Sequence, residues 1–318
     1  MGNGVPLEKQ AAPPYRLHLR QGQCPGDVLV LTAAVESLHR AYPGEYLVSV
    51  QTTAPEIWWH NPGVTDTPAY QCAILEMEYP AIHECGTRHV HFMHAFCEYL
   101  SNLIGRPVPL AVNRPHLYLA PDEQKPLDAV RTDVPYCVIN AGHKLDYTAK
   151  FASTAIWQEV VDYFRGRLQF VQVGEANPHH IHRPLEGVLN LIGKTTFREF
   201  FRLVRYSTVA CGPVSFLMHT AAAFEVPYVC LAGGREEPSW AAYSTTQYLH
   251  TMGALDCCRT SRACWKSRTV PLKDGNRNDL SLCSLPVIQD DGEAVPKCLD
   301  MIGAAGVIRA IDQQLGGR

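Results

Sequence analysis

Residues 15–51 read YRLHLRQGQCPGDVLVLTAAVESLHRAYPGEYLVSVQ, and this stretch decides the fold. An alternating strand pattern comes first and is followed by a loop at residues 21–26 that contains Gly and Pro. Asp27 then opens a run whose apolar residues recur at helical spacing, namely Val28, Leu31, Ala34, Val35 and Leu38. The run stops at the Tyr-Pro-Gly of residues 42–44, and a second strand pattern follows at 46–51. This strand, loop, helix and strand order predicts a parallel α/β sheet.

The same alternation continues along the chain. A helical pattern at residues 91–103 precedes a Pro-rich polar stretch at 107–135, which we interpret as a linker between two domains. After it we expect five strands, at residues 136–140, 168–173, 188–191, 208–211 and 228–231, and helices at 154–165, 195–206 and 215–224. Two Rossmann-like halves are the simplest architecture. We place the domains at residues 1–125, 126–250 and 251–318, the last being a cysteine-rich segment with a C-terminal helix.

Composition narrows the class of protein. The chain has 318 residues, which exceeds the usual range for a single core, and 46% of them are hydrophobic. The formal net charge of -3 provides no positive field for a nucleic acid, so we expect no such partner. The first 14 residues lack the apolar core of a signal peptide, and no stretch is long enough to span a bilayer. These features predict a cytoplasmic protein without a transmembrane segment.

Candidate functional residues lie in loops that follow the predicted strands. In doubly wound sheets ligands bind beyond the carboxyl ends of the strands. The loops at residues 21–27, 140–150, 211–219 and 231–240 should therefore converge on a cleft between the domains. Lys144 and Lys150, the helix that begins near Ser215, and the loop of Gly233, Gly234 and Glu237 are the candidates that these loops supply.

Two blocks of this sequence resemble glycosyltransferase family 9, the ADP-heptose heptosyltransferases. Residues 26–35, GDVLVLTAAV, with residues 38–44, LHRAYPG, are similar to the opening helix of that family. A second block, from GKTT at 193–196 through Gly212 and Pro213 to HTAAA at 219–223, is similar to its nucleotide-sugar domain. The resemblance implies a GT-B fold, with an acceptor domain followed by a nucleotide-sugar domain. It also implies an inverting enzyme whose donor is a sugar on a nucleoside diphosphate, ADP-linked and heptose-like.

The resemblance assigns a role to Asp27, namely removal of the proton from the acceptor hydroxyl. A carboxylate at a helix N-terminus is held in a fixed direction, which suits a general base. The same helix terminus lowers the pKa of an Asp, which weakens it as a base. Without the resemblance, a capping role for Asp27 is the better interpretation.

The leaving diphosphate needs cationic side chains and backbone amides, because the sequence contains no Asp-x-Asp motif for a divalent ion. We therefore expect catalysis that does not depend on a metal. The resemblance places a phosphate-binding lysine at Lys150, with Lys144 as its competitor. Gly212, Ser215 and His219 would border the phosphates at a helix N-terminus, and Gly233, Gly234 and Glu237 the base or ribose. Val214 and Phe216 depart from the family pattern, which expects an aspartate and a glycine there, so the sugar itself stays open.

The cysteines divide into two sets. Seven are scattered among apolar neighbours and are interpreted as small hydrophobic residues: Cys24, Cys72, Cys85, Cys97, Cys137, Cys211 and Cys230. The other five lie close together in a polar segment, and four thiolates suit a tetrahedral structural Zn or Fe site. We expect the ligands to be Cys258, Cys264, Cys283 and Cys298, with Cys258 preferred to its neighbour Cys257. The segment resembles the cysteine appendage of autotransporter heptosyltransferases, which implies iron, while reduced thiols without a metal are the alternative.

Other interpretations remain open at this point. One alternative is a nucleotide-sugar epimerase, which shares the GT-B architecture but needs no second substrate. The other is a non-catalytic binding protein whose transferase fold has lost its activity, which would explain the departure at Val214. Two histidine groups, at residues 89–94 and 179–182, have spacings that suit a metal but lack a carboxylate or cysteine partner nearby. We expect surface or acceptor contacts from them. The acceptor itself is not identified by the sequence.

Overall fold

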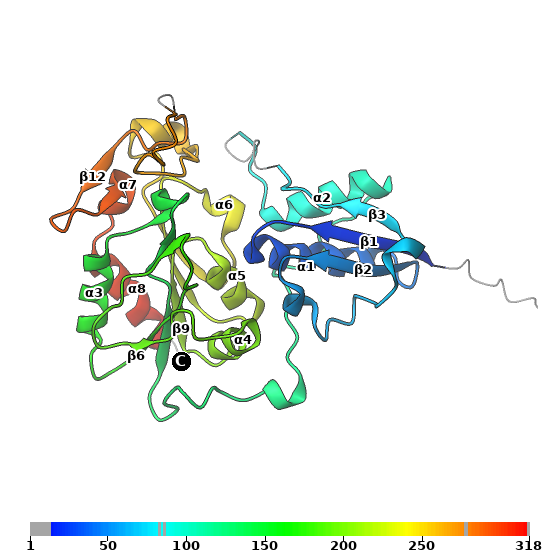
Figure 1. The fold of residues 1–318 in the computed structure, drawn as a ribbon, viewed down its shortest axis with the longest axis horizontal. Helices are drawn as coiled ribbons and strands as arrows, with labels where there is room; N and C mark the ends of the chain where they lie inside the picture. Colours follow the sequence, from blue (N-terminus) through cyan, green and yellow to red (C-terminus); the bar gives the residue numbers. More distant parts are fainter. Residues whose placement is uncertain (1–13, 82–83, 85–86, 277–278, 317–318) are drawn as a thin grey trace, which may run out of the picture.

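The computed structural model describes residues 14–81, 84, 87–276 and 279–316, and these residues fold into two lobes (Figure 1). In the first lobe β1 (Tyr15–Gln21) lies between β2 (Tyr46–Thr52) and β3 (Ala73–Glu76) in a parallel sheet. The helices α1 (Pro25–Ala41) and α2 (Phe92–Ile104) pack against each other. The N-terminal residues of α1, including Val28 to Val35, are buried, since this helix contacts the sheet, α2 and the second lobe.

The second lobe contains a parallel sheet of six strands in the order β11-β10-β9-β4-β6-β8. These strands are β4 (Tyr136–Ile139), β6 (Gln169–Gln172), β8 (Leu189–Asn190), β9 (Val209–Gly212), β10 (Tyr228–Gly233) and β11 (Thr246–His250). The helices between them are α3 (Thr154–Tyr163), α4 (Phe197–Arg205), α5 (Phe216–Ala223) and α6 (Pro238–Ala241). The sheet has the strand arrangement of a Rossmann fold. Successive strands are added on one side from β4 to β8 and on the other side from β9 to β11, so the order reverses between β4 and β9.

Short elements complete the two lobes. Two antiparallel pairs form from β5 (His143–Lys144) with β7 (His180–Ile181), and from β12 (Pro286–Ile288) with β13 (Ala294–Pro296). The 3-10 helices are η1 (Pro55–Trp58), η2 (Ala69–Gln71), η3 (Pro121–Glu123), η4 (Thr148–Lys150) and η5 (Asp256–Ser261). The chain ends with α7 (Lys297–Asp300) and α8 (Ala304–Gly316), and α8 packs against α3 of the second lobe. Its buried residues, Val307 and Ile311 among them, therefore share a core with Trp157 of α3.

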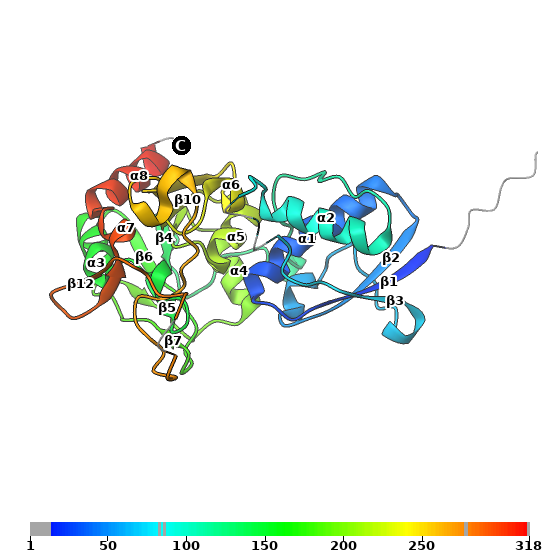
Figure 2. The same cartoon turned by 90° about the horizontal axis from the view of Figure 1, so that it is seen from above.

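Two helices make a main contact between the lobes. The N-terminal part of α1 faces α5 of the second lobe, and both views place this contact where the lobes meet (Figure 2). Gly26 lies so close to α5 that a Cβ on it would be 3.2 Å from His219 Cδ2 and 3.7 Å from the Phe216 backbone. The beginning of α1 is thereby held against the carboxyl end of the second sheet.

The structure confirms the strands and helices that the periodicity predicts, including the stretch without strand or α-helix between residues 107 and 135. Two strands of the parallel sheets escaped prediction, β3 and β11, as did the four strands of the short antiparallel pairs. In β3 most side chains are exposed, and in β11 most are half-buried, so neither has a clear alternation of buried and exposed residues. Of the helices in the described part of the chain, none is both long and apolar enough to cross a membrane. The predicted absence of a signal peptide concerns residues 1–14, of which only Pro14 is described.

Candidate functional site

Residues from both lobes meet where α1 approaches the switch point of the second sheet, and we call this place the junction. The first lobe contributes the loop that ends in Asp27. The second lobe contributes the loops after β4 and β9, the strands between which the order reverses, and the loop after β10. The members of the junction are Cys24, Asp27, Tyr79, Lys144, Lys150, Val214, His219 and Glu236.

Asp27 is the third residue of α1, and its carboxylate completes a capping interaction. The backbone N–H of Cys24 donates to Asp27 Oδ2 at 3.1 Å, and Tyr79 donates a side-chain hydrogen bond to the same carboxylate. The N-cap residue is Cys24 and not Asp27, but Asp27 takes the third position of the helix and accepts from the N-cap amide, so it does have a capping role. This capping interaction is compatible with a catalytic role, because it fixes the direction of the Asp27 carboxylate.

Burial raises the pKa of Asp27 to about 6, even though Lys150, the Cys24 backbone and Tyr79 act to lower it. The helix N-terminus was expected to lower the pKa of Asp27. That expectation was wrong, because desolvation raises this pKa by more than the helix terminus lowers it. A carboxyl group with a pKa near 6 is ionised at neutral pH and is a better proton acceptor than an ordinary aspartate.

Lys150 lies at the end of η4, on the opposite side of the junction. Its ammonium donates to Val214 O at 3.3 Å and forms an ion pair with Glu236 Oε1 at 2.8 Å. Val214 follows β9, so Lys150 reaches from the loop after β4 to the loop after β9. Lys144 also crosses between the lobes, since its Nζ lies 3.8 Å from Cys24 Sγ. The structure thus brings Asp27 together with both predicted lysines.

Gly212, Ser215 and His219 surround the first turn of α5. A Cβ on Gly212 would lie 2.8 Å from Asn140 O, so only glycine fits where β9 leaves the sheet beside β4. Ser215 is the N-cap residue, but its side chain makes no capping hydrogen bond. His219 is buried and neutral, because burial lowers its pKa to about 3, and its Nδ1 lies 2.7 Å from the Tyr243 hydroxyl.

Gly233, Gly234 and Glu237 belong to the loop after β10, and their contacts differ from those expected. Glu237 Oε2 lies 3.1 Å from His89 Nδ1 of the first lobe and accepts a hydrogen bond from Ser239. The two glycines contact the cysteine segment, because a Cβ on Gly233 or Gly234 would lie 2.9 Å from the sulfur of Cys298 or Cys258, respectively. The expected contact of this loop with a base or ribose therefore stays a prediction.

The predicted histidine groups have structural contacts. His91 caps α2 by accepting from Met93 N, and its other ring nitrogen donates to Ala242 O of the second lobe at 3.1 Å. The ring of His182 lies between Gly142 and Gly174, where a Cβ on either glycine would come within 2.5 Å of it. The groups therefore organise the loops and the contact between lobes.

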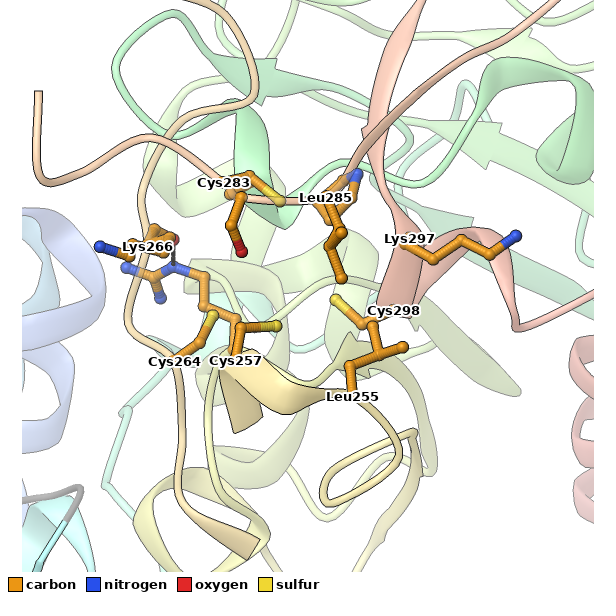
Figure 3. A pocket seen from close by; sticks show the side chains of 12 residues that line it. Leu255, Cys257, Cys264, Lys266, Cys283, Leu285, Lys297 and Cys298 are labelled. Atoms are coloured by element: carbon orange, nitrogen blue, oxygen red, sulfur yellow. Dashed lines mark hydrogen bonds between the residues drawn. The ribbon is translucent and has the colours of Figure 1, made fainter. Parts of the chain in front are cut away.

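Four cysteines of the C-terminal segment line a cavity of about 10 Å³. Figure 3 shows the sulfur atoms of Cys257, Cys264, Cys283 and Cys298 pointing toward one common space. Cys258 is not part of this lining; it is fully buried and packs beneath Gly234. Of the two adjacent cysteines, Cys257 lines the cavity and Cys258 does not, so the preference for Cys258 as a ligand stays an untested prediction.

The thiols of this cavity are not arranged as a finished metal site. Within the described residues, no group of three or more His, Cys, Asp or Glu side chains has the geometry to hold an ion. Burial raises the pKa of Cys298 to about 11 and also raises the pKa of Cys257 and of Cys264, so these thiols are protonated. A bound cation would reverse this preference by stabilising thiolates. The donor set fits a tetrahedral thiolate site in chemistry and number.

The scattered cysteines follow the prediction in part. Cys97, Cys137, Cys211 and Cys230 are fully buried among apolar residues, as expected. Cys24 is exposed and belongs to the junction, so the prediction that it fills a core was wrong. Cys72 is half-buried, and Cys85 lies outside the described residues.

The similarity of this chain to known proteins lies in its fold. No model of a protein family matches the sequence, and no curated protein matches it. Solved structures do match. The structure of a glycosyl transferase family 9 protein from Veillonella parvula superposes with a TM-score of 0.64 at 14% identity, over 96% of this chain and 98% of that one.

Two further structures agree. The iron-containing dodecameric glycosyltransferase TibC of enterotoxigenic E. coli has a TM-score of 0.63 at 15% identity, over 95% of this chain and 76% of that one. The ADP-heptose lps heptosyltransferase II of E. coli has a TM-score of 0.56 at 14% identity, over 94% of this chain and 98% of that one. The chain has the GT-B fold. The predicted architecture of two Rossmann-like halves is thereby confirmed.

The site also contains residues that the sequence argument missed. Tyr79 donates to Asp27, and Glu236 pairs with Lys150, yet neither was singled out. Tyr79 lies in a loop whose sequence gives no sign that it folds back toward α1. Glu236 had a signal, because it belongs to the charged run Arg-Glu-Glu directly after a fully buried strand.

Proposed function

We propose that this protein is an inverting glycosyltransferase that transfers a sugar from a nucleoside diphosphate donor to an acceptor hydroxyl. The observation that carries the proposal is the pairing across the junction. A carboxylate with a pKa of about 6, Asp27, belongs to one lobe, and a lysine, Lys150, belongs to the switch point of the other. The fold shared with glycosyltransferases supports this reading.

The reaction uses these groups in one displacement. The acceptor oxygen attacks the anomeric carbon while its proton passes to the Asp27 carboxylate. The bond from the anomeric carbon to the diphosphate oxygen breaks, and the diphosphate leaves as an anion. Because attack and departure occur on opposite faces, the configuration at this carbon inverts. Lys150 and the first backbone amides of α5 would stabilise the departing charge.

The donor is proposed to be an ADP-linked, heptose-like sugar, because two of the structural matches are named for ADP-heptose. Lys144 and Ser215 would assist at the phosphates, and the loop of Gly233 and Glu237 would border the nucleoside. This chemistry requires no metal ion, since cationic side chains and amides perform the charge stabilisation.

The decisive experiment is a product analysis with ADP, GDP and UDP sugars, each with and without a mixture of glycan, peptide and small-molecule hydroxyl acceptors. A glycosylated acceptor with inverted linkage supports the proposal. An isomerised nucleotide sugar formed without any acceptor would identify an epimerase. Tight binding of a nucleotide without any turnover would favour a retired transferase.

We further propose that Cys257, Cys264, Cys283 and Cys298 hold a structural Zn or Fe ion. The four sulfurs that face one cavity support this, and so does the iron-containing match TibC. The ion would crosslink η5, the loops at residues 264 and 283, and α7. Four protein ligands leave no position for a substrate, so the ion would contribute to folding and not to the transfer step.

A further inference from the structure

Three charged side chains are packed together behind the junction. Lys150 Nζ lies 2.8 Å from Glu236 Oε1, and Arg235 Nη1 lies 2.5 Å from the same oxygen. The side chains of Arg235 and Glu236 are each only 6% exposed, whereas that of Lys150 is 24% exposed. One carboxylate oxygen is thus shared by two cations, and only one of those cations has access to a ligand.

The members of this cluster differ in how firmly they are held. The guanidinium carbon of Arg235 lies 5.4 Å from the ring centre of Tyr147 and 5.3 Å from that of Trp265, and its Nε donates to Lys266 O at 2.7 Å. Among the described residues, the hydrogen-bond acceptors of Lys150 are Val214 O and Glu236, and its Nζ lies 5.7 Å from the ring centre of Tyr147. Arg235 and Glu236 therefore form the buried pair, and the ammonium of Lys150 is the member that a ligand can reach.

The cluster remains charged at neutral pH. Burial opposes the ionised form of Glu236, but Lys150 and Arg235 outweigh it and hold the pKa of Glu236 below its ordinary value. An anion that approaches Lys150 has to compete with this carboxylate. When Lys150 also contacts the anion, its interaction with Glu236 weakens, but Glu236 keeps Arg235 as its partner, so no buried charge is left alone.

We propose that Glu236, anchored by Arg235, is the positioning residue of Lys150. Without donor it holds the ammonium beside Val214 O, at the carboxyl end of β9. When the donor binds, Lys150 contacts both the carboxylate and the diphosphate, and its direction is fixed for the moment when the diphosphate leaves. This inference rests on the proposed transfer function and deepens it. Glu236 weakens the binding of a diphosphate in the ground state and accelerates its departure.

The position of Glu236 has a second effect at Asp27. The charged and titratable groups that face Asp27 are Lys150 and Glu236 of the second lobe and Cys24 and Tyr79 of its own lobe. Burial raises the pKa of Asp27, and the negative charge of Glu236 raises it further. Removal of that charge lowers the pKa of Asp27. The acidic limb of the activity profile then moves to lower pH, because the base stays ionised at lower pH.

The test compares the wild type with Glu236→Gln and Glu236→Asp. Calorimetry first identifies which of ADP, GDP and UDP binds the wild type most tightly, and that diphosphate is the probe. We expect Glu236→Gln to bind it about tenfold more tightly, since a like charge near the phosphates is removed. Turnover should fall about tenfold or more, since the lysine loses its direction. The acidic limb of kcat/KM should shift to lower pH.

Glu236→Asp separates charge from reach. It keeps the negative charge, so the acidic limb stays where it is in the wild type, but its shorter side chain holds Lys150 less well and turnover falls. Glu293→Gln is the matched control. Glu293 is a buried carboxylate of the same lobe that accepts from Thr154 and pairs with Arg183 at 2.9 Å, away from the junction. The variant Glu293→Gln should lower the melting temperature of the protein without changing its affinity for the diphosphate or the pH profile of its activity.

The outcomes distinguish this inference from the proposed function. A wild type that binds none of the three diphosphates contradicts the proposed function. If the wild type binds one of them, and Glu236→Gln weakens binding and turnover in parallel with an unmoved acidic limb, Glu236 is only structural. Unchanged binding and turnover in both Glu236 variants would equally overturn the positioning role.

Discussion

At the scale of single residues, the carboxylate of Asp27 combines two interactions that oppose each other. The Cys24 amide and Lys150 favour its ionised form, whereas burial between the lobes disfavours it, and burial wins. The resulting pKa of about 6 keeps the group ionised at pH 7 and still basic. The hydrogen bond to the helix terminus supplies the direction that a general base requires.

Replacing Asp27 with Asn tests this assignment. The amide keeps the size of the side chain, so folding and nucleotide binding should be preserved, while turnover should fall about 10²-fold or more. In the wild type, kcat/KM should decline as the pH falls through about 6, because the base becomes protonated. The variant should lack this limb. A variant with nearly normal turnover would remove Asp27 from the mechanism.

Replacing Lys150 with Ala tests the other side of the junction. The lost contact is to phosphate charge, so the affinity for a nucleoside diphosphate should fall by about tenfold, with little change for the nucleoside alone. Calorimetric titration with both ligands gives the comparison, and the nucleoside serves as the internal control. Equal losses for the two ligands would indicate damage to the lobe and not a missing phosphate contact.

The sequence supported these two residues only through a family pattern. Nothing in the spacing of Asp27 or Lys150 distinguishes them from a capping residue and a surface lysine. Glu236 and Tyr79 were missed because their roles arise from loops that fold together across long sequence separations. Desolvation, which decides the pKa of Asp27, depends on the second lobe and is absent from any local pattern.

At the scale of elements, prediction succeeded where one face of an element is buried. The apolar spacing of α1 predicted its extent to within a few residues, because this helix is buried over most of its length. The strands β3 and β11 lie at sheet edges and have largely exposed or half-buried residues, so their sequences lack alternation. The cysteine-rich part before α7 is harder still, because it packs against the loop at Gly233 and Gly234 and against η4, which are distant in sequence.

The cysteine segment yields a prediction that separates adjacent residues. Protein produced without added metal or an affinity tag should contain about one Zn or Fe per chain. Cys257→Ser should lose this metal, as should Cys283→Ser and Cys298→Ser, and the segment should then melt before the nucleotide lobe. Cys258→Ser is the matched control, since its sulfur lies under Gly234 and outside the cavity. Elemental analysis and thermal unfolding measure both effects.

Two results would contradict this assignment. Loss of metal in Cys258→Ser with retention in Cys257→Ser would restore the ligand set expected from the sequence. A wild type that is free of metal and yet fully folded through residue 298 would show that the cavity is lined by ordinary reduced thiols.

At the scale of the whole molecule, a buried guanidinium adds to the contact of α1 with α5 and to the loop contacts between the lobes. Arg198 of α4 donates to Glu123 Oε1 at 2.7 Å, to Tyr118 O at 2.8 Å and to Glu56 O at 3.1 Å. Glu56 belongs to η1 of the first lobe, and the other two acceptors belong to the stretch between the sheets. Arg198 therefore fixes the position of the junction at a distance from it.

The last prediction concerns this clamp. Arg198→Ala should lower the free energy of unfolding by about 2 kcal/mol at pH 7, because it removes the charged hydrogen-bond donor of the half-buried Glu123 carboxylate. The hydrogen bond from Arg198 lowers the pKa of Glu123 to about 2, below its value in the unfolded chain. The stabilisation is therefore present above pH 4.5 and is lost as the pH falls from about 4.5 toward 2. The difference in free energy of unfolding between the wild type and the variant should narrow over that range.

Arg202→Ala is the matched control, since Arg202 lies one turn later and donates to the carbonyls of Lys125 and Pro126. Thermal unfolding at pH 7 and pH 3 measures the stabilities, and small-angle scattering should detect a larger radius of gyration only in the Arg198 variant. Equal and small effects of both substitutions would mean that Arg198 is not needed to hold the lobes together.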